Sequence, residues 1–232
     1  MNRPYIICHM LVSIDGKVTG SFLSKEAASD GVELYYEKNR TINSKGFICG
    51  RVTMEESFTN KYYPDLSKYQ NVEIEKTDYV VDNSFEKYAV AFDRFGRLGW
   101  QNSVIVDEDP GYNKAHIIEV LTENVKGEYL AYLQEIKVSY IFAGKDELSV
   151  GLALEKLKTL FNIDKLLLEG GSIINGAFLK EDLVDELSLV YVPLIGEKED
   201  KPLFYNSEMT NFELISSDVF KNNIYARYKV KR

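Results

Sequence analysis

The sequence predicts an α/β protein with a mostly parallel sheet and an antiparallel hairpin towards its C-terminal end. Short apolar runs typical of buried strands alternate along the chain with segments in which apolar residues recur every three or four positions, as on one face of a helix. Strands and helices in such close alternation indicate the crossovers of a parallel sheet. Residues 212–220 and 223–230 differ, because only Lys221 and Asn222 separate them, and this predicts a hairpin.

The composition favours one domain and excludes several classes of protein. With 232 residues, 45% of them hydrophobic, and no repeat or low-complexity linker, we predict a single domain over 1–232. A net charge of −8 argues against a broad nucleic-acid or anionic-membrane surface. The apolar run over 5–14 is too short to span a bilayer, and both cysteines lie in apolar runs. We therefore expect a cytoplasmic protein without a disulfide or a metal site.

The elements follow in order from these runs and from the residues between them. Strands are predicted over 5–12, 47–49, 88–92, 103–106, 115–121, 138–142, 166–168 and 185–193. Helices are predicted over 31–42 with Ser29 and Asp30 as the cap, from Met54, over 126–136, from Ser149, and over 173–180. The tyrosine-rich stretch over 59–76 is predicted to be a long surface loop.

Polar side chains follow the first and second strands where each strand ends. Asp15 and Lys17 come directly after the first strand, where side chains of an α/β sheet can face a substrate. The alternative is an Asx turn beside a solvated lysine. Gly50 follows the second strand, and after it Arg51 could offer two donors to a phosphate and Thr53 a hydroxyl. The alternative there is a surface arginine and a helix-capping threonine.

Arginines follow the third strand. Arg94 and Arg97 come directly after the strand over 88–92, and an arginine at such a place can match a ribose 2′-phosphate. This favours NADP over NAD. The alternative is a turn with two solvated arginines, which suits Arg97 better than Arg94.

A glycine-rich turn follows the strand over 166–168. Glu169 is followed by Gly170, Gly171 and Ser172, at the predicted start of a helix. Glycines let a phosphate approach the backbone, and the first N–H groups of a helix favour an anion. An ordinary strand-to-helix turn without a ligand is the alternative.

Together these motifs resemble the reductase domain of riboflavin biosynthesis, within the dihydrofolate-reductase-like superfamily. Residues 13–17 are similar to the family's Ser-Leu-Asp-Gly-Lys loop, and residues 168–171, 175–179, 183–187 and 201–204 are similar to its C-terminal signature. The resemblance runs along nearly the whole chain. It implies a three-layer α/β/α fold, usually dimeric, so we expect a homodimer. It also implies that NADPH reduces a ring-opened ribosylamino-pyrimidine to the ribitylamino product.

The resemblance implies roles for single residues as well. Asp15, Lys17 and Glu169 match positions beside the reacting centre, so we expect them to hold a small heterocyclic acceptor. One of them, or a water that they position, would supply the proton. The residues assigned to the cofactor, from the motifs and from the resemblance, are Gly50, Arg51, Thr53, Arg94, Gly170, Gly171, Ser172 and Ile173.

Departures from the family's pattern leave the substrate open. Where members acting on the riboflavin intermediate carry Asp-Asp-Pro, this chain has Glu-Glu-Ser over 55–57, and residues 20–28 include no tryptophan. Residues 50–55 are instead similar to the Gly-Arg-x-Thr stretch of dihydrofolate reductases. No His-x-Glu or Cys-x-x-Cys occurs, so the deaminase zinc site of bifunctional relatives is not expected. The rival hypotheses are a reductase of a pterin or another heterocycle, and a non-catalytic NADP-binding protein.

Overall fold

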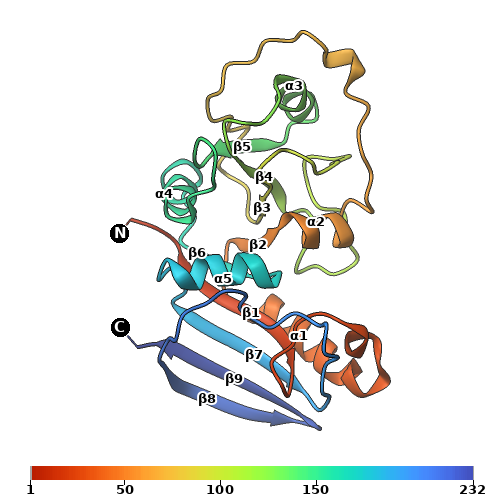
Figure 1. The fold of residues 1–232 in the computed structure, drawn as a ribbon, viewed down its shortest axis with the longest axis vertical. Helices are drawn as coiled ribbons and strands as arrows, with labels where there is room; N and C mark the ends of the chain where they lie inside the picture. Colours follow the sequence, from red (N-terminus) through yellow and green to blue (C-terminus); the bar gives the residue numbers. More distant parts are fainter. Residues whose placement is uncertain (1, 232) are drawn as a thin grey trace. The chain divides into compact units, whose positions relative to one another are not determined.

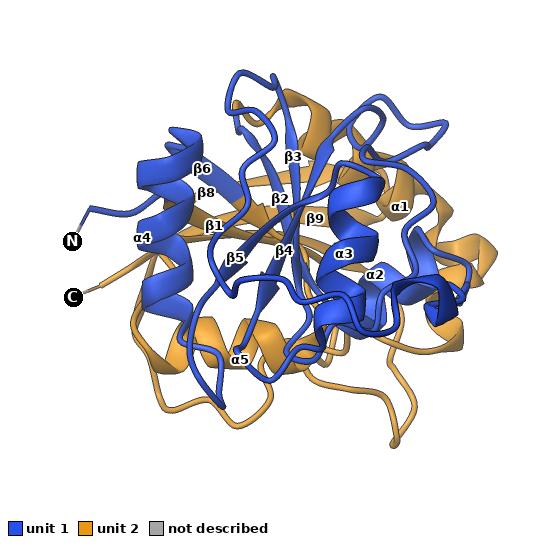
Figure 2. Ribbon diagram, turned by 90° about the horizontal axis from the view of Figure 1, so that it is seen from above, with its two compact units in different colours: residues 1–4, 44–166 blue, residues 5–43, 167–232 orange. Residues whose placement is uncertain are grey.

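The chain divides into two units in the computed structural model, which describes residues 2–231. Unit 1 holds the described residues up to Pro4 together with Ser44–Leu166, and unit 2 holds Tyr5–Asn43 and the chain from Leu167 onwards. Figure 2 colours unit 1 blue and unit 2 orange. The single domain expected from the composition stays a prediction.

Unit 1 is built on parallel strands in the order β5-β4-β3-β2 (Figure 1). Every residue of β3 is buried, as the unbroken apolar run Tyr-Ala-Val-Ala-Phe predicts for a strand covered on both faces. The strands are β2 (Gly46–Gly50), β3 (Tyr88–Phe92), β4 (His116–Leu121) and β5 (Ser139–Phe142). The helices are α2 (Arg51–Ser57), α3 (Gly127–Glu135) and α4 (Val150–Phe161).

Unit 2 combines a parallel pair of strands with the predicted hairpin. Its strands run in the order β1-β7-β9-β8, with β1 parallel to β7 and the remaining pairs antiparallel. They are β1 (Tyr5–Ser13), β7 (Glu186–Val192), β8 (Phe212–Phe220) and β9 (Asn223–Val230). The helices are α1 (Ser29–Thr41) and α5 (Ser172–Lys180). The chain passes from unit 1 to unit 2 within β6 (Lys165–Leu168).

The predicted fold class, an α/β protein with a mostly parallel sheet and a C-terminal antiparallel hairpin, is confirmed. The hairpin strands have the predicted bounds, and the apolar run over 5–14 forms β1 rather than a longer segment. Within residues 2–231, none of the helices has the length and apolarity that a membrane crossing requires.

One predicted strand and two predicted helix starts are wrong. The stretch over 103–106 forms only an isolated bridge between Val104 and His116, because Ile105 bonds back to the backbone of Lys114. Helix α1 begins at Ser29 and follows a 3₁₀ turn, so Ser29 and Asp30 lie inside the helix and do not cap it. Helix α2 begins directly after β2 rather than at Met54.

Candidate active site

Residues 194–205, which we call the strap, hold the loop that follows β1 in unit 2. The amide of Ile14 donates to Leu194 O at 2.9 Å, and the amide of Val18 donates to Lys201 O at 2.9 Å. In the other direction, the strap's Leu203 amide donates to Gly16 O at 2.9 Å. The backbone that carries Asp15 and Lys17 is therefore fixed at several points.

The strap also binds the beginning of α5. The hydroxyl of Ser172 donates to Pro202 O at 2.5 Å, and the amide of Tyr205 donates to Ser172 O at 3.1 Å. Asn175 adds a side-chain bond from Nδ2 to Leu203 O at 3.2 Å. The strap thus brings together two predicted groups of unit 2, the loop after β1 and the turn before α5. Sequence reasoning treated them as separate strand ends.

The side chains of Asp15 and Lys17 both meet the strap. Asp15 Oδ1 accepts hydrogen bonds from Ser13 Oγ at 2.6 Å and from the Gly196 amide at 2.9 Å. These bonds, the one from Ser13 above all, lower the pKa of the exposed Asp15 carboxyl. Lys17 Nζ donates to Asp200 O at 2.8 Å. This loop therefore presents the Asp15 carboxylate and the Lys17 side chain, each bonded to the strap.

Glu169 is a buried carboxyl with an amide partner. Its side chain is only 7% exposed, and Oε1 accepts a hydrogen bond from Asn39 Nδ2 at 2.7 Å. Asn39, on α1, is also 7% exposed. Burial, together with the charge of Glu169, raises the pKa of the Cys8 thiol on β1. Sequence reasoning missed Asn39, although a polar residue on the buried stripe of an amphipathic helix is a usable signal.

The turn between Glu169 and α5 combines a left-handed glycine with a helix start that has no side-chain cap. Gly170 has a φ of +89°, and Gly171 is the N-cap of α5 without a side-chain cap bond. The first turn of this nine-residue helix includes no acidic residue. A Cβ built on Gly170 would meet the Met10 side chain at 3.2 Å, so glycine fits best here. The predicted cofactor residue Ile173 is 67% exposed at the start of the same helix.

In unit 1, the predicted phosphate ligand Arg51 is held by a carboxylate. Its Nη1 lies 2.7 Å from Glu55 Oε2, one turn further along α2, and Tyr63 donates its hydroxyl to Glu55 Oε1 at 2.6 Å. The bond from Tyr63, followed by that from Arg51, lowers the pKa of Glu55. Gly50 ends β2, and Thr53 lies within α2 rather than in a loop before it. Arg51 would have to exchange Glu55 for a phosphate.

Arg94 is held in a similar way after β3. Its Nε donates to Asp146 O at 2.8 Å, and Nη2 lies 2.5 Å from Glu147 Oε1. The guanidinium groups of Arg94 and Arg97 lie 4.7 and 4.9 Å from the centre of the Phe95 ring. Both arginines therefore have structural contacts, and Arg94 also has an exposed ion pair that a ligand anion could replace.

Unit 1 also holds a buried acid pair that sequence reasoning missed. Glu119 Oε1 accepts from Trp100 Nε1 and from the Tyr129 hydroxyl, and Asp93 Oδ2 accepts from the Leu98 amide at 2.9 Å. Among the described residues, neither Glu119 Oε2 nor Asp93 Oδ1 has a hydrogen-bond partner. Burial, reinforced by the charge of Asp93, raises the pKa of Glu119 well above its ordinary value. Burial thus favours the protonated form of Glu119 in the core of unit 1.

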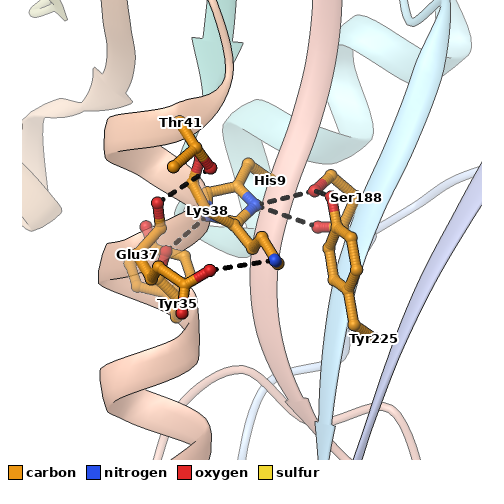
Figure 3. A network of polar contacts seen from close by, with 7 residues as sticks. All are labelled: His9, Tyr35, Glu37, Lys38, Thr41, Ser188 and Tyr225. Atoms are coloured by element: carbon orange, nitrogen blue, oxygen red, sulfur yellow. Dashed lines mark hydrogen bonds and ion pairs between the residues drawn. The ribbon is translucent and has the colours of Figure 1, made fainter. Parts of the chain in front are cut away.

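His9 belongs to a buried network in unit 2 that joins α1 to the strands (Figure 3). Its Nε2 lies 3.0 Å from Tyr35 O, and its Nδ1 lies 3.0 Å from Ser188 Oγ, which in turn lies 2.9 Å from the Tyr225 hydroxyl. Nδ1 also lies 3.2 Å from Ser188 O, so each ring nitrogen contacts one backbone carbonyl. Burial lowers the pKa of His9 to about 4. The ring is therefore a neutral structural group.

Comparisons with known proteins give a consistent result. The family model described as the RibD C-terminal domain matches residues 4–226. Two similar proteins carry the name 2,5-diamino-6-ribosylamino-4(3H)-pyrimidinone 5′-phosphate reductase. The protein from Aquifex aeolicus is 26% identical over 215 residues, which cover 90% of this chain and 85% of the relative. The protein from Methanothermobacter thermautotrophicus is 24% identical over 236 residues, which cover 99% of each chain.

A solved structure is similar over the whole chain. Acinetobacter baumannii RibD, form 1, has a TM-score of 0.65 and 20% sequence identity. The match covers 100% of this chain and 59% of that longer chain. At this identity the likeness supports the fold, and the chain spans less than two thirds of the solved protein.

Proposed function

We propose a reductase function from one premise: this chain belongs to the RibD C-terminal domain family. The family expected from the sequence is therefore confirmed. The expected enzyme class is confirmed too, because both curated relatives are named as reductases of a pyrimidinone phosphate. The chain is thus an oxidoreductase of a family that uses a nicotinamide cofactor.

The substrate that we propose is a ribosylamino-pyrimidine 5′-phosphate. Its reduction adds a hydride to C1′ of the ring-opened ribose and a proton to the attached nitrogen, and this gives a ribitylamino group. Two bases are candidates. The relatives are named for the diamino-pyrimidinone, and the amino-uracil form carries an oxygen where that base has an amino group.

The cofactor that we propose is NADPH, which would supply the hydride. In unit 2, the uncapped start of α5 and the glycine turn before it support binding of a phosphate group, with Gly170, Gly171, Ser172 and Ile173 as the residues concerned. In unit 1, we propose that Gly50, Arg51, Thr53 and Arg94 contribute to cofactor binding. The two arginines would each exchange a carboxylate partner for a phosphate, the buried Glu55 for Arg51 and the exposed Glu147 for Arg94.

In unit 2, the acceptor would be held by Asp15, Lys17 and Glu169. The observation that carries this assignment is the strap, which fixes the loop of Asp15 and Lys17 and the turn after Glu169 through the same twelve-residue segment. The lowered pKa of Asp15 keeps it ionised, so it suits orientation of the acceptor and not donation of a proton. Lys17, Glu169 or a water that they position would then protonate the nitrogen.

A substrate panel tests this proposal. Consumption of NADPH and of NADH is followed with three acceptors, namely the diamino-pyrimidinone substrate, the amino-uracil substrate and dihydrofolate. We expect turnover with a ribosylamino-pyrimidine and a preference for NADPH. Turnover with dihydrofolate alone would replace this function by that of a pterin reductase. Binding of NADPH without oxidation by any acceptor would support a non-catalytic protein instead.

We also propose a homodimer in a reducing, cytoplasmic setting. β7 is paired on both sides within unit 2, whereas Leu214, Val219 and Ile224 on the hairpin are 54%, 80% and 49% exposed and could cover a second copy. Cys8 and Cys49 are buried thiols. Light scattering during size-exclusion chromatography measures the oligomeric state, and a single monomer mass would reject the dimer.

A further inference from the structure

Asn39 is out of place as a helix residue. It lies near the end of α1, on the stripe whose buried members are Gly31, Leu34 and Asn39, where an apolar side chain would extend the core. Asparagine is a poor residue inside a helix, and a buried amide costs free energy unless it is hydrogen-bonded. Its presence at this position therefore requires a partner that compensates.

That partner is Glu169. Asn39 Nδ2 lies 2.7 Å from Glu169 Oε1, and both side chains are only 7% exposed. The two residues come from α1 and from the turn before α5, which are 130 positions apart in the chain. Burial, and after it the charge of Glu169, raises the pKa of the Cys8 thiol on β1. A short bond between two buried groups fixes the plane of the carboxyl.

The chemistry of the amide gives this bond a direction. The NH₂ group of asparagine can only donate, so Glu169 Oε1 must act as the acceptor. An apolar residue on α1 could pack against the carboxyl, but it could not distinguish its two oxygens.

We propose that Asn39 is the positioning residue of Glu169: its bond to Oε1 sets the orientation of the carboxyl that exchanges a proton with the bound acceptor. The part about the acceptor rests on the proposed reductase function. The contact itself does not, so the two can be tested separately.

A swapped pair of residues tests the contact without any substrate. Asn39→Asp and Glu169→Gln are made singly and together, and thermal unfolding is measured from about pH 5 to about pH 8. Asn39→Asp places two carboxyls against each other, whereas Glu169→Gln keeps a carbonyl oxygen that can accept from Asn39. The double change restores one carboxylate and one amide in exchanged places. We expect Asn39→Asp to lose roughly 3 °C or more in Tm, Glu169→Gln to lose less, and the double variant to recover most of the Asn39→Asp loss.

The single Asn39→Asp variant adds a second readout. Two adjacent buried carboxyls compete for one proton, so its loss in Tm should increase as the pH rises, and this increase should disappear in the double variant. Losses that simply add in the double variant, with no recovery and no change in pH dependence, would overturn the contact.

Activity then separates positioning from folding. Asn39→Leu keeps the size of the side chain, completes the apolar stripe and removes the donor. We expect turnover to fall about tenfold, the pH profile of kcat to shift by about one unit and the KM for the nicotinamide cofactor to stay unchanged. The swapped double variant should recover stability but not turnover, since its carboxylate lies on α1. An unchanged kcat profile in Asn39→Leu would overturn the positioning role.

Absence of turnover in the unmodified protein with every acceptor would reject the proposed function alone, because the unfolding experiment decides the contact by itself.

Discussion

Glu119 of unit 1 and Glu169 of unit 2 are both buried carboxyl groups, and their neighbours differ. Glu119 is fully buried, bonds to Trp100 and Tyr129, and lies beside the second acid Asp93. Glu169 is bonded to an amide and directly precedes a glycine turn with uncapped helix N–H groups. Burial alone therefore does not mark a carboxyl as functional. What distinguishes Glu169 is its place beside backbone that could receive a ligand.

The largest expected effect, on turnover, tests the difference between Glu169 and Glu119 directly. Glu169→Gln should lower reductase turnover by about 10²- to 10⁴-fold with little change in nicotinamide cofactor affinity, because an amide cannot exchange the proton. Glu119→Gln should leave turnover within about twofold. Steady-state kinetics on the two matched variants checks both statements. A similar loss of turnover in the folded Glu119→Gln variant would contradict the distinction, because both carboxyls would then be needed for activity.

Acid stability gives the next largest effect, through the buried histidine of unit 2. The pKa of His9 falls from 6.5 to about 4 on burial, so its neutral form contributes stability above pH 6.5 that is lost as the pH falls towards 4. This difference corresponds to about 3 kcal/mol of unfolding free energy. Compared with the unmodified protein, His9→Gln should show a flatter loss of stability between these pH values. Denaturant unfolding at several pH values measures the slope, and equal slopes would contradict the prediction.

Glu119 should show the opposite slope. Its raised pKa means that its contribution is present below pH 4.5 and is lost as the pH rises through the pKa that it has in the folded state. Glu119→Gln keeps the acceptor for Trp100 and Tyr129 and offers an N–H to Asp93. At about pH 7 we expect the Tm of this variant to lie roughly 2–4 °C above that of the unmodified protein, and this gain to vanish in acid. A gain that does not depend on pH would have another cause.

Arg94 and Arg97 of unit 1 allow a similar comparison between an arginine proposed to bind a phosphate and one that is not. Arg94→Gln should weaken NADPH binding about fivefold and NADH binding hardly at all, since a charge-assisted bond to the extra phosphate is partly offset by the lost pair with Glu147. Arg97→Gln is the matched control, because Arg97 lies on the same Phe95 ring and has no assigned phosphate. Fluorescence titration of both cofactors measures the affinities. Equal losses for NADPH and NADH would remove Arg94 from the phosphate site.

The smallest effect belongs to a solvent-exposed pair. Lys221 and Asp30 lie 2.6 Å apart, with side chains 56% and 40% exposed. Surface pairs of this kind contribute about 0–1 kcal/mol and are screened by salt. Lys221→Gln should therefore change Tm by roughly 2 °C or less, and high salt should abolish the difference. A larger change would mean that this pair organises the hairpin.

The fold could be predicted further than the site. The strands of the hairpin were predictable because a two-residue turn separates two runs of strand character, and both signals are local. The expected strand over 103–106 failed because pairing depends on what lies opposite, and Ile105 bonds back across a turn. Asn39 was marked only by its polarity on the buried stripe of α1, and neither it nor the strap gave a local signal for its partners, which are distant in sequence. Most bonds of the strap also use backbone groups that every residue has.

The discontinuity of unit 2 has a consequence for synthesis of the chain. The apolar strand β1 pairs with β7, which leaves the ribosome almost 180 residues later, whereas the strands of unit 1 are all present long before that. Closing so long a loop is slow, and an unpaired apolar strand is prone to aggregate while it waits. The strand that leads to Asp15 and Lys17 therefore stays without its β7 partner until residues 186–192 have been made.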